Sequence, residues 1–160
     1  MNPFERAVEF VLDHEGGLSE DPKDPGGLTK FGISQRAYPN LDIRNLTREA
    51  AIELYRSDYW NRCKCGELPS PFAVILFDSA VNQGPGAAIR MLQKSLSIKV
   101  DGVMGPETIG AAHRANIHNT VCEFVARRAF DYAQNPNVVT FGMGWYRRLA
   151  QCQMAAMEPL

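Results

Sequence analysis

The segment from residue 72 to residue 82 places the strongest constraint on the fold of this chain of 160 residues. Its residues are apolar around nearly the whole circumference of a helix, with Phe, Ala, Val, Ile and Leu following one another. A helix of this composition is stable only where other elements cover it on most sides. Pro71 stands just before it, where proline is favoured in the first turn. We therefore predict a central helix over residues 72–82, with other helices packed around it.

The rest of the chain supplies those surrounding helices. Asn2 and Pro3 form a favourable helix start, and apolar residues then recur on one helical face as far as about His14. A threonine cap at Thr47 and prolines at first-turn positions mark several later starts. The later helices are expected over residues 48–59, 86–96, 107–114, 118–134 and 140–157. Alternation over residues 28–33 predicts a short β-hairpin, so the expected fold class is mainly α with one small hairpin.

The first helix ends in a single glutamate, Glu15, and a loop rich in glycine and proline follows it. The loop carries Asp24, and Thr29 lies five residues further on. The helix dipole disfavours a negative charge at the position of Glu15, which suits a group that must hold a proton. Glycosidic bond cleavage needs one carboxyl group that protonates the leaving oxygen and a second group that places or activates water. The loop therefore predicts a glycosidase site with Glu15 as general acid.

The identity of the second catalytic group stays open between several residues. Asp24 is either a second catalytic carboxylate or the residue that begins a tight turn. Thr29 either aligns water beneath the anomeric carbon or favours a strand through its branched side chain. Glu20 and Asp21 lie on the same loop and compete for the role of second carboxylate. Asp24 and Thr29 are the two preferred candidates.

The sequence blocks around these residues resemble glycoside hydrolase family 108. Glu-Gly-Gly at residues 15–17 and Asp-Pro-Gly-Gly-x-Thr-x-x-Gly-Ile at residues 24–33 are similar to its most specific block, although Leu18 stands where the family usually has tyrosine. Three further blocks resemble the family in the same way: residues 77–85, 101–108 and 141–148. The resemblance therefore extends over nearly the whole chain.

The family consists of lysozyme-like N-acetylmuramidases, found in phage endolysins and in some bacterial proteins. The resemblance implies a lysozyme-like fold and hydrolysis of the β-1,4 bond between N-acetylmuramic acid and N-acetylglucosamine in bacterial peptidoglycan. It implies no cofactor and no metal, and a bacteriolytic, antimicrobial role. Two alternatives remain: a lytic transglycosylase, and a protein that binds peptidoglycan or assists secretion without turnover.

Several side chains outside the catalytic loop are expected to contact the glycan. Aromatic rings stack on the apolar faces of sugars, and amides at the end of the central helix could bind an N-acetyl group. Two loop glycines leave room for a bulky ligand. The expected substrate-binding residues are Gly26, Gly27, Tyr59, Trp60, Asn82 and Gln83. The alternatives are core packing for the aromatic pair and capping of the central helix by Asn82.

We expect one domain over residues 1–160, with a catalytic half at 1–83 and a helical subdomain at 84–160. Residues 101–108 resemble the short motif of peptidoglycan-binding helical modules. The same residues are also explained locally by a glycine turn and a helix that starts at Pro106. The motif is therefore a weak indication of binding.

Charge is unevenly distributed along the chain. Residues 1–80 hold 9 basic and 13 acidic side chains, and residues 81–160 hold 8 and 5, so the halves carry −4 and +3. The positive half predicts a basic face that is attracted to an anionic envelope, formed by Arg127, Arg128, Arg147 and Arg148. No dense basic stripe interleaved with aromatic residues is present, so nucleic acid is not an expected partner. We expect a monomer.

The N-terminal residues lack a basic region followed by an apolar block, so no secretory signal is predicted. The protein is expected to be made in the cytoplasm and to act on the wall after release through a holin or by lysis. The four cysteines allow three disulfide pairings, and in that compartment free thiols are the favoured state. The cysteines are Cys63, Cys65, Cys122 and Cys152.

Overall fold

The computed structural model of the protein describes residues 1–20 and 27–159. Within this part of the chain the fold is mostly helical, with a single two-stranded antiparallel sheet, so the predicted fold class is confirmed. The α-helices are α1 (Pro3–Glu15), α2 (Arg48–Tyr55), α3 (Ser70–Gln83), α4 (Pro85–Ser95), α5 (Pro106–Arg114), α6 (Ile117–Ala133) and α7 (Val138–Met157). A π-helix, η1 (Arg56–Asn61), and a short 3-10 helix, η2 (Cys65–Glu67), follow α2.

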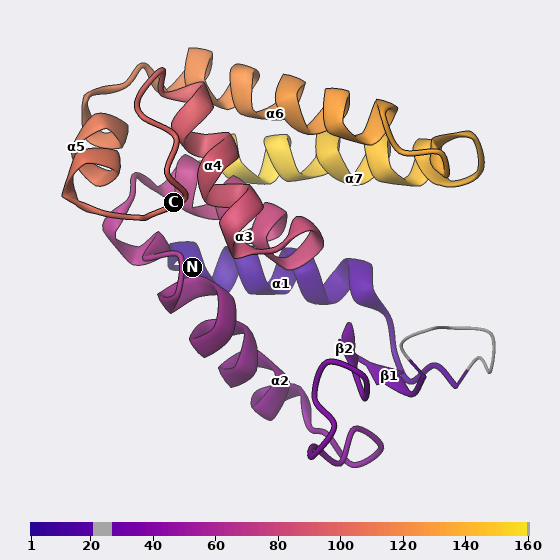
Figure 1. The fold of residues 1–160 in the computed structure, drawn as a ribbon. Coiled ribbons are helices and arrows are strands. Elements are labelled where there is room, and N and C mark those ends of the chain that lie inside the picture. The colour runs from indigo at the N-terminus through magenta and orange to yellow at the C-terminus, as the bar shows by residue number, and fades with distance from the viewer. Residues whose placement is uncertain (21–26, 160) are drawn as a thin grey trace.

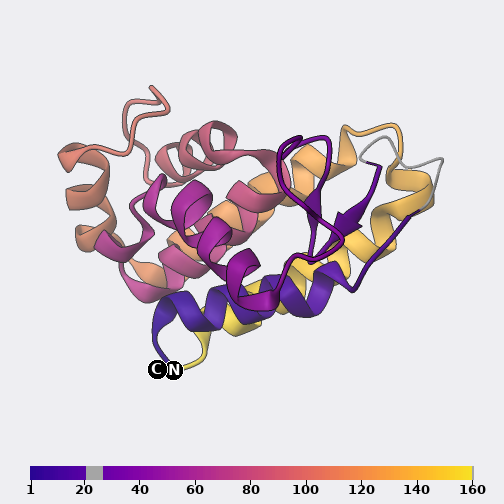
Figure 2. The same cartoon turned by 90° about the horizontal axis from the view of Figure 1, so that it is seen from below.

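Helix α3 is the central element, as its composition predicts. It packs against α1, α4, α6 and α7, and every side chain from Phe72 to Ala80 is buried. Figure 1 shows α6 and α7 side by side on one side of α3, with α1 on the other, and Figure 2 shows the two termini close together. No helix in residues 1–20 or 27–159 combines the length and apolar character that crossing a bilayer requires.

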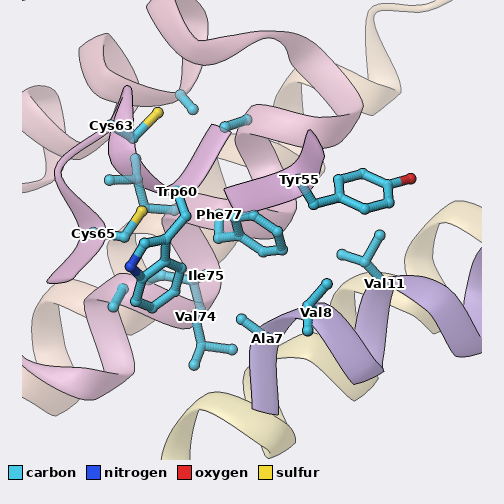
Figure 3. Packing of buried hydrophobic residues seen from close by; sticks show 14 of the residues in the cluster. Ala7, Val8, Val11, Tyr55, Trp60, Cys63, Cys65, Val74, Ile75 and Phe77 are labelled. Atoms are coloured by element: carbon cyan, nitrogen blue, oxygen red, sulfur yellow. The ribbon is translucent and has the colours of Figure 1, made fainter. Parts of the chain in front are cut away.

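An aromatic cluster forms the part of the core nearest to α1 (Figure 3). The Trp60 ring meets Phe4 and Phe77 edge to face, with ring centroids 5.2 and 5.7 Å apart. Tyr55 meets the other side of Phe77 at 6.2 Å. Edge-to-face contacts of this kind add to the stabilisation that comes from burying the rings. The cluster joins α1, α3 and the segment after α2 into one core.

The predicted helix over residues 48–59 changes its winding at Arg56. Thr47 caps it as expected, because its side chain accepts the backbone N–H of Ala50, but the last turns form η1. In a π-helix residues five apart share a face, so Trp60 follows Tyr55 onto the buried side. The prediction that Trp60 binds sugar is therefore wrong: its ring is 7% exposed and packed in the core.

The hairpin is formed by β1 (Thr29–Lys30) and β2 (Ile33–Ser34). Its turn requires glycine at position 32, where φ is +77°. A Cβ atom on Gly32 would lie 2.6 Å from the Tyr55 hydroxyl and 2.8 Å from Cγ of Glu15. The turn therefore presses directly against the end of α1.

The motif at residues 101–108 is organised by one buried amide, that of Gln93. Its Nε2 donates to Asp101 Oδ1 at 2.8 Å, to the Val103 carbonyl at 3.0 Å and to Thr108 Oγ1 at 3.1 Å. Its Oε1 accepts the backbone N–H groups of Asp101 and Gly102. The polar side chains of this motif are thus engaged within the fold.

We expect Gln93→Leu to destabilise the protein by at least about 2 kcal/mol, because it leaves several buried polar groups without partners. Urea unfolding measures this loss. Lys94→Leu introduces leucine at the next residue, which is exposed, and serves as the control. It is expected to change stability by less than about 0.5 kcal/mol. Equal effects of the two changes would contradict a structural role for Gln93.

The four cysteines are free thiols. Cys63, Cys65 and Cys152 are buried, and Cys122 is exposed. Burial raises the pKa of the Cys152 thiol well above its ordinary value. The buried thiols therefore act as small apolar side chains of the core.

Candidate active site

Glu15 lies at the last position of α1, where Gly16 ends the helix with φ at +67°. Its side chain is 24% exposed, and Oε1 accepts a hydrogen bond of 2.6 Å from Nη1 of Arg148 on α7. Beside it the Tyr55 hydroxyl donates to the carbonyl of Phe31 at 2.8 Å, which fixes the hairpin turn against the glutamate. The carboxyl group is thus held in place and still reaches solvent.

A buried charge cluster stands behind Glu15. Arg148 donates through Nε and Nη2 to Oδ1 of Asp78 at 3.1 and 2.9 Å, and Arg128 donates through Nη1 to Oδ2 at 2.8 Å. Arg128 also donates to the hydroxyl of Tyr132 at 2.8 Å. The Asp78 and Arg128 side chains are 1% and 0% exposed. When Glu15 is ionised, the cluster holds two positive and two negative side chains.

This cluster keeps Asp78 and Arg148 ionised. Burial by itself would raise the pKa of the Asp78 carboxyl, but the guanidinium groups of Arg128 and Arg148 outweigh it and hold that pKa below its ordinary value. Burial would lower the pKa of Arg148, and the carboxylates of Asp78 and Glu15 outweigh it and raise that pKa. Arg148 is therefore a fixed positive charge against the carboxylate of Glu15.

The composition of the central helix contains a signal for Asp78 that the prediction did not use. It is the one charged residue in the apolar segment 72–82, and a charge inside a buried helix needs a partner. Its partners lie 50 and 70 residues further along the chain. Their identity follows only from the tertiary packing.

The predicted basic face is wrong in its composition. Arg128 is buried and Arg148 is 15% exposed, and both face Asp78. Arg127 pairs with Glu123 on its own helix at 3.3 Å. Of the four arginines, only Arg147 contributes an exposed charge for which the described residues supply no salt bridge. Two of the four arginines therefore serve the interior of the protein.

The structure describes only some of the candidates for the second catalytic group. Thr29 lies on β1, where its backbone pairs with Ser19 and Ser34. Glu20 forms an exposed ion pair with Arg44. Asp24, Asp21 and Gly26 lie outside the described residues, and Gly27 is exposed with φ at +69°.

A polar cleft of about 540 Å³ opens between the segment after β2 and the π-helix. Tyr59 lines it, and the Tyr59 ring lies 5.8 Å from Tyr55, whose hydroxyl reaches the hairpin turn beside Glu15. The cleft is lined by Ala37, Tyr38, Ser57, Asp58, Tyr59, Arg62 and Pro85. Tyr59 therefore lines an open cleft, and its contact with the glycan stays a prediction.

The amides of Asn82 and Gln83 line a second hollow of about 240 Å³ on the other side of the α3–α4 turn. Asn82 Nδ2 donates to the carbonyl of Asp78 at 2.7 Å, and Gln83 Nε2 donates to Asp131 Oδ2 at 2.5 Å. Gln83 Oε1 in turn accepts the hydroxyl of Ser79 at 3.0 Å, and binding of an N-acetyl group by these amides stays a prediction. In the described part of the chain no group of three His, Cys, Asp or Glu side chains could hold a metal ion.

A glutamate at the end of the first helix, beside a small hairpin and against a bundle of helices, is consistent with a lysozyme-like fold. The family model described as glycosyl hydrolase 108 matches residues 8–84, which include Glu15, the hairpin and α3. The fold is similar to that in the structure of Brucella abortus SagA, with a TM-score of 0.86 and 31% sequence identity. That similarity covers 96% of this chain and 93% of the other. No curated protein matches the sequence.

The chain belongs to glycosyl hydrolase family 108, and it is a glycoside hydrolase. The family also supports peptidoglycan as its substrate. The family model ends near the start of α4, whereas the similarity to SagA extends through most of the C-terminal helices.

Proposed function

We propose that this protein is an N-acetylmuramidase that hydrolyses the β-1,4 bond between N-acetylmuramic acid and N-acetylglucosamine, and that it serves as a phage endolysin. The placement of Glu15 carries the proposal. It is a partly exposed carboxyl group at a helix end, beside the hairpin turn at Gly32 and fixed from behind by Arg148. A lysozyme needs a group of this kind to protonate the leaving oxygen.

Glu15 acts as general acid, and Arg148 stabilises the carboxylate that forms when Glu15 has transferred its proton. When Glu15 gives its proton to the glycosidic oxygen it becomes a carboxylate. Arg148 already donates a 2.6 Å hydrogen bond to that position and remains charged. The cluster thus stabilises the ionised product of proton transfer without rearranging, which is the general advantage of a preorganised site. Water attacks from the opposite side, placed by Asp24 or Thr29.

The protein is made in the cytoplasm and reaches the wall after release, acting as a monomer. A lytic transglycosylase would use the same glutamate but let the muramyl 6-hydroxyl attack in place of water. Digesting purified sacculi and analysing the fragments separates the two reactions. We expect reducing muramic acid ends; anhydro-muramyl ends would establish the transglycosylase, and intact sacculi would establish a binding protein without turnover.

Asp24→Asn tests the second catalytic group. If the carboxylate supports the transition state or orients water, turnover on sacculi falls about tenfold or more while glycan binding is nearly unchanged. If Asp24 only starts the turn, asparagine makes the same side-chain bond to the backbone and turnover is retained. We expect the fall. An Asp24→Asn enzyme with parental turnover would move the role to Thr29.

A further inference from the structure

The polar cleft beside Tyr59 contains both charged and hydroxyl groups. Residues five apart share one face of a π-helix, so Tyr55 and Trp60 both face the core. The residues of this segment that line the cleft are Ser57, Asp58, Tyr59 and Arg62.

The acidic group in this cleft already accepts a hydrogen bond at each of its two oxygens. Asp58 accepts the hydroxyl of Tyr38 at Oδ2 and the hydroxyl of Ser57 at Oδ1, both at 2.6 Å. Burial is the main cause that raises the pKa of Tyr38, followed by this hydrogen bond, so the phenol stays neutral and continues to donate. Asp58 is thus occupied in joining the segment after β2 to the π-helix.

Arg62 supplies the positive charge of the cleft. It is exposed, and among the described residues no carboxylate lies within salt-bridge distance of it, including Asp58 four residues earlier. A guanidinium group offers planar paired donors that match a carboxylate. The half-buried Tyr59 ring on the same cleft offers an aromatic surface to an attached sugar.

We propose that Arg62 is a specificity residue that binds a carboxylate carried by the muramic acid residues of the glycan, while Tyr59 contacts the sugar. This inference rests on the proposed muramidase function. Two sources of the carboxylate share this chemistry: the stem peptide of intact peptidoglycan, and the lactyl group that becomes free when stem peptides are removed. A glycan built only of N-acetylglucosamine carries neither.

Arg62→Gln tests the proposal, because it removes the charge and keeps much of the length and hydrogen-bonding capacity. Lysis of intact sacculi is measured for the wild-type protein, Arg62→Gln and Arg114→Gln, which makes the same change at an exposed position outside the cleft. We expect the apparent KM of Arg62→Gln to rise about tenfold, the scale of one charge-assisted hydrogen bond. The kcat value and Arg114→Gln should stay near parental values, and the KM of Arg62→Gln should depend less on salt.

Binding assays then identify the source of the carboxylate. Each of the two arginine changes is combined with Glu15→Gln so that substrates are not cleaved, and soluble strands with stem peptides, strands without them and chitooligosaccharides are titrated. Selective loss of affinity for peptide-bearing strands assigns the stem peptide, and loss on the stripped strands assigns the lactyl group. An equal loss on chitooligosaccharides, or parental KM and affinity throughout, overturns the proposal. A wild-type protein that leaves sacculi intact contradicts the muramidase function instead.

Discussion

Glu15→Gln is expected to lower wall-lytic turnover by at least about 100-fold, the scale of general acid catalysis. Glutamine keeps the size of the side chain and an oxygen that accepts the hydrogen bond from Arg148, but it has no proton to transfer. The melting temperature should therefore change little. Turnover on purified sacculi and a thermal melt of the same preparation measure the two effects.

Glu9→Gln is the matched control for this experiment. Glu9 lies on the same helix and pairs with Arg48 at the surface, where its contribution to stability is small. Its turnover should equal that of the parent. If Glu15→Gln retained activity within tenfold of the parent, Glu15 would not be the general acid.

Asp78→Ala is expected to destabilise the protein by about 3–5 kcal/mol, because it leaves the buried charges of Arg128 and Arg148 without their shared carboxylate. Few point changes elsewhere in the chain should lower the free energy of unfolding as much. Urea unfolding gives the free energy, and circular dichroism shows whether the variant folds. Where Asp78→Ala does not fold, Asp78→Asn keeps the shape and one acceptor and is measured in its place.

Glu123→Ala provides the comparison at the surface. Glu123 also pairs with an arginine of α6, Arg127, but both side chains are largely exposed to solvent. We expect a loss of less than about 1 kcal/mol for it. A loss at Asp78 no larger than at Glu123 would show that the buried cluster adds nothing to stability.

Much of the fold follows from local features of the sequence. The apolar segment 72–82 predicts the central helix, and it forms one, although it begins two residues earlier, at Ser70. The position of Glu15 at a helix end is confirmed, because the apolar spacing before it and the glycines after it act over a few residues. The hairpin is confirmed for the same reason, since Gly32 permits its turn.

The errors arise where distant residues decide the outcome. The position of Trp60 after a capped helix and before a polar loop leaves both an exposed ring and core packing open. The structure widens the helix there and the ring enters the space between Phe4 and Phe77. No pattern within residues 48–61 indicates this change of winding, because the Trp60 ring packs against side chains of α1 and α3 that are distant in the sequence.

The sequence by itself determined the helical class, the hairpin and the position of Glu15 at a helix end, since each depends on interactions between residues close in the chain. Only the tertiary structure decided how Glu15 is held. Its partner Arg148 lies 133 residues away, and Asp78 joins that arginine to Arg128 from a third helix. These four charges carry no common period or spacing. They come together because each one, when buried, is stable only beside an opposite charge.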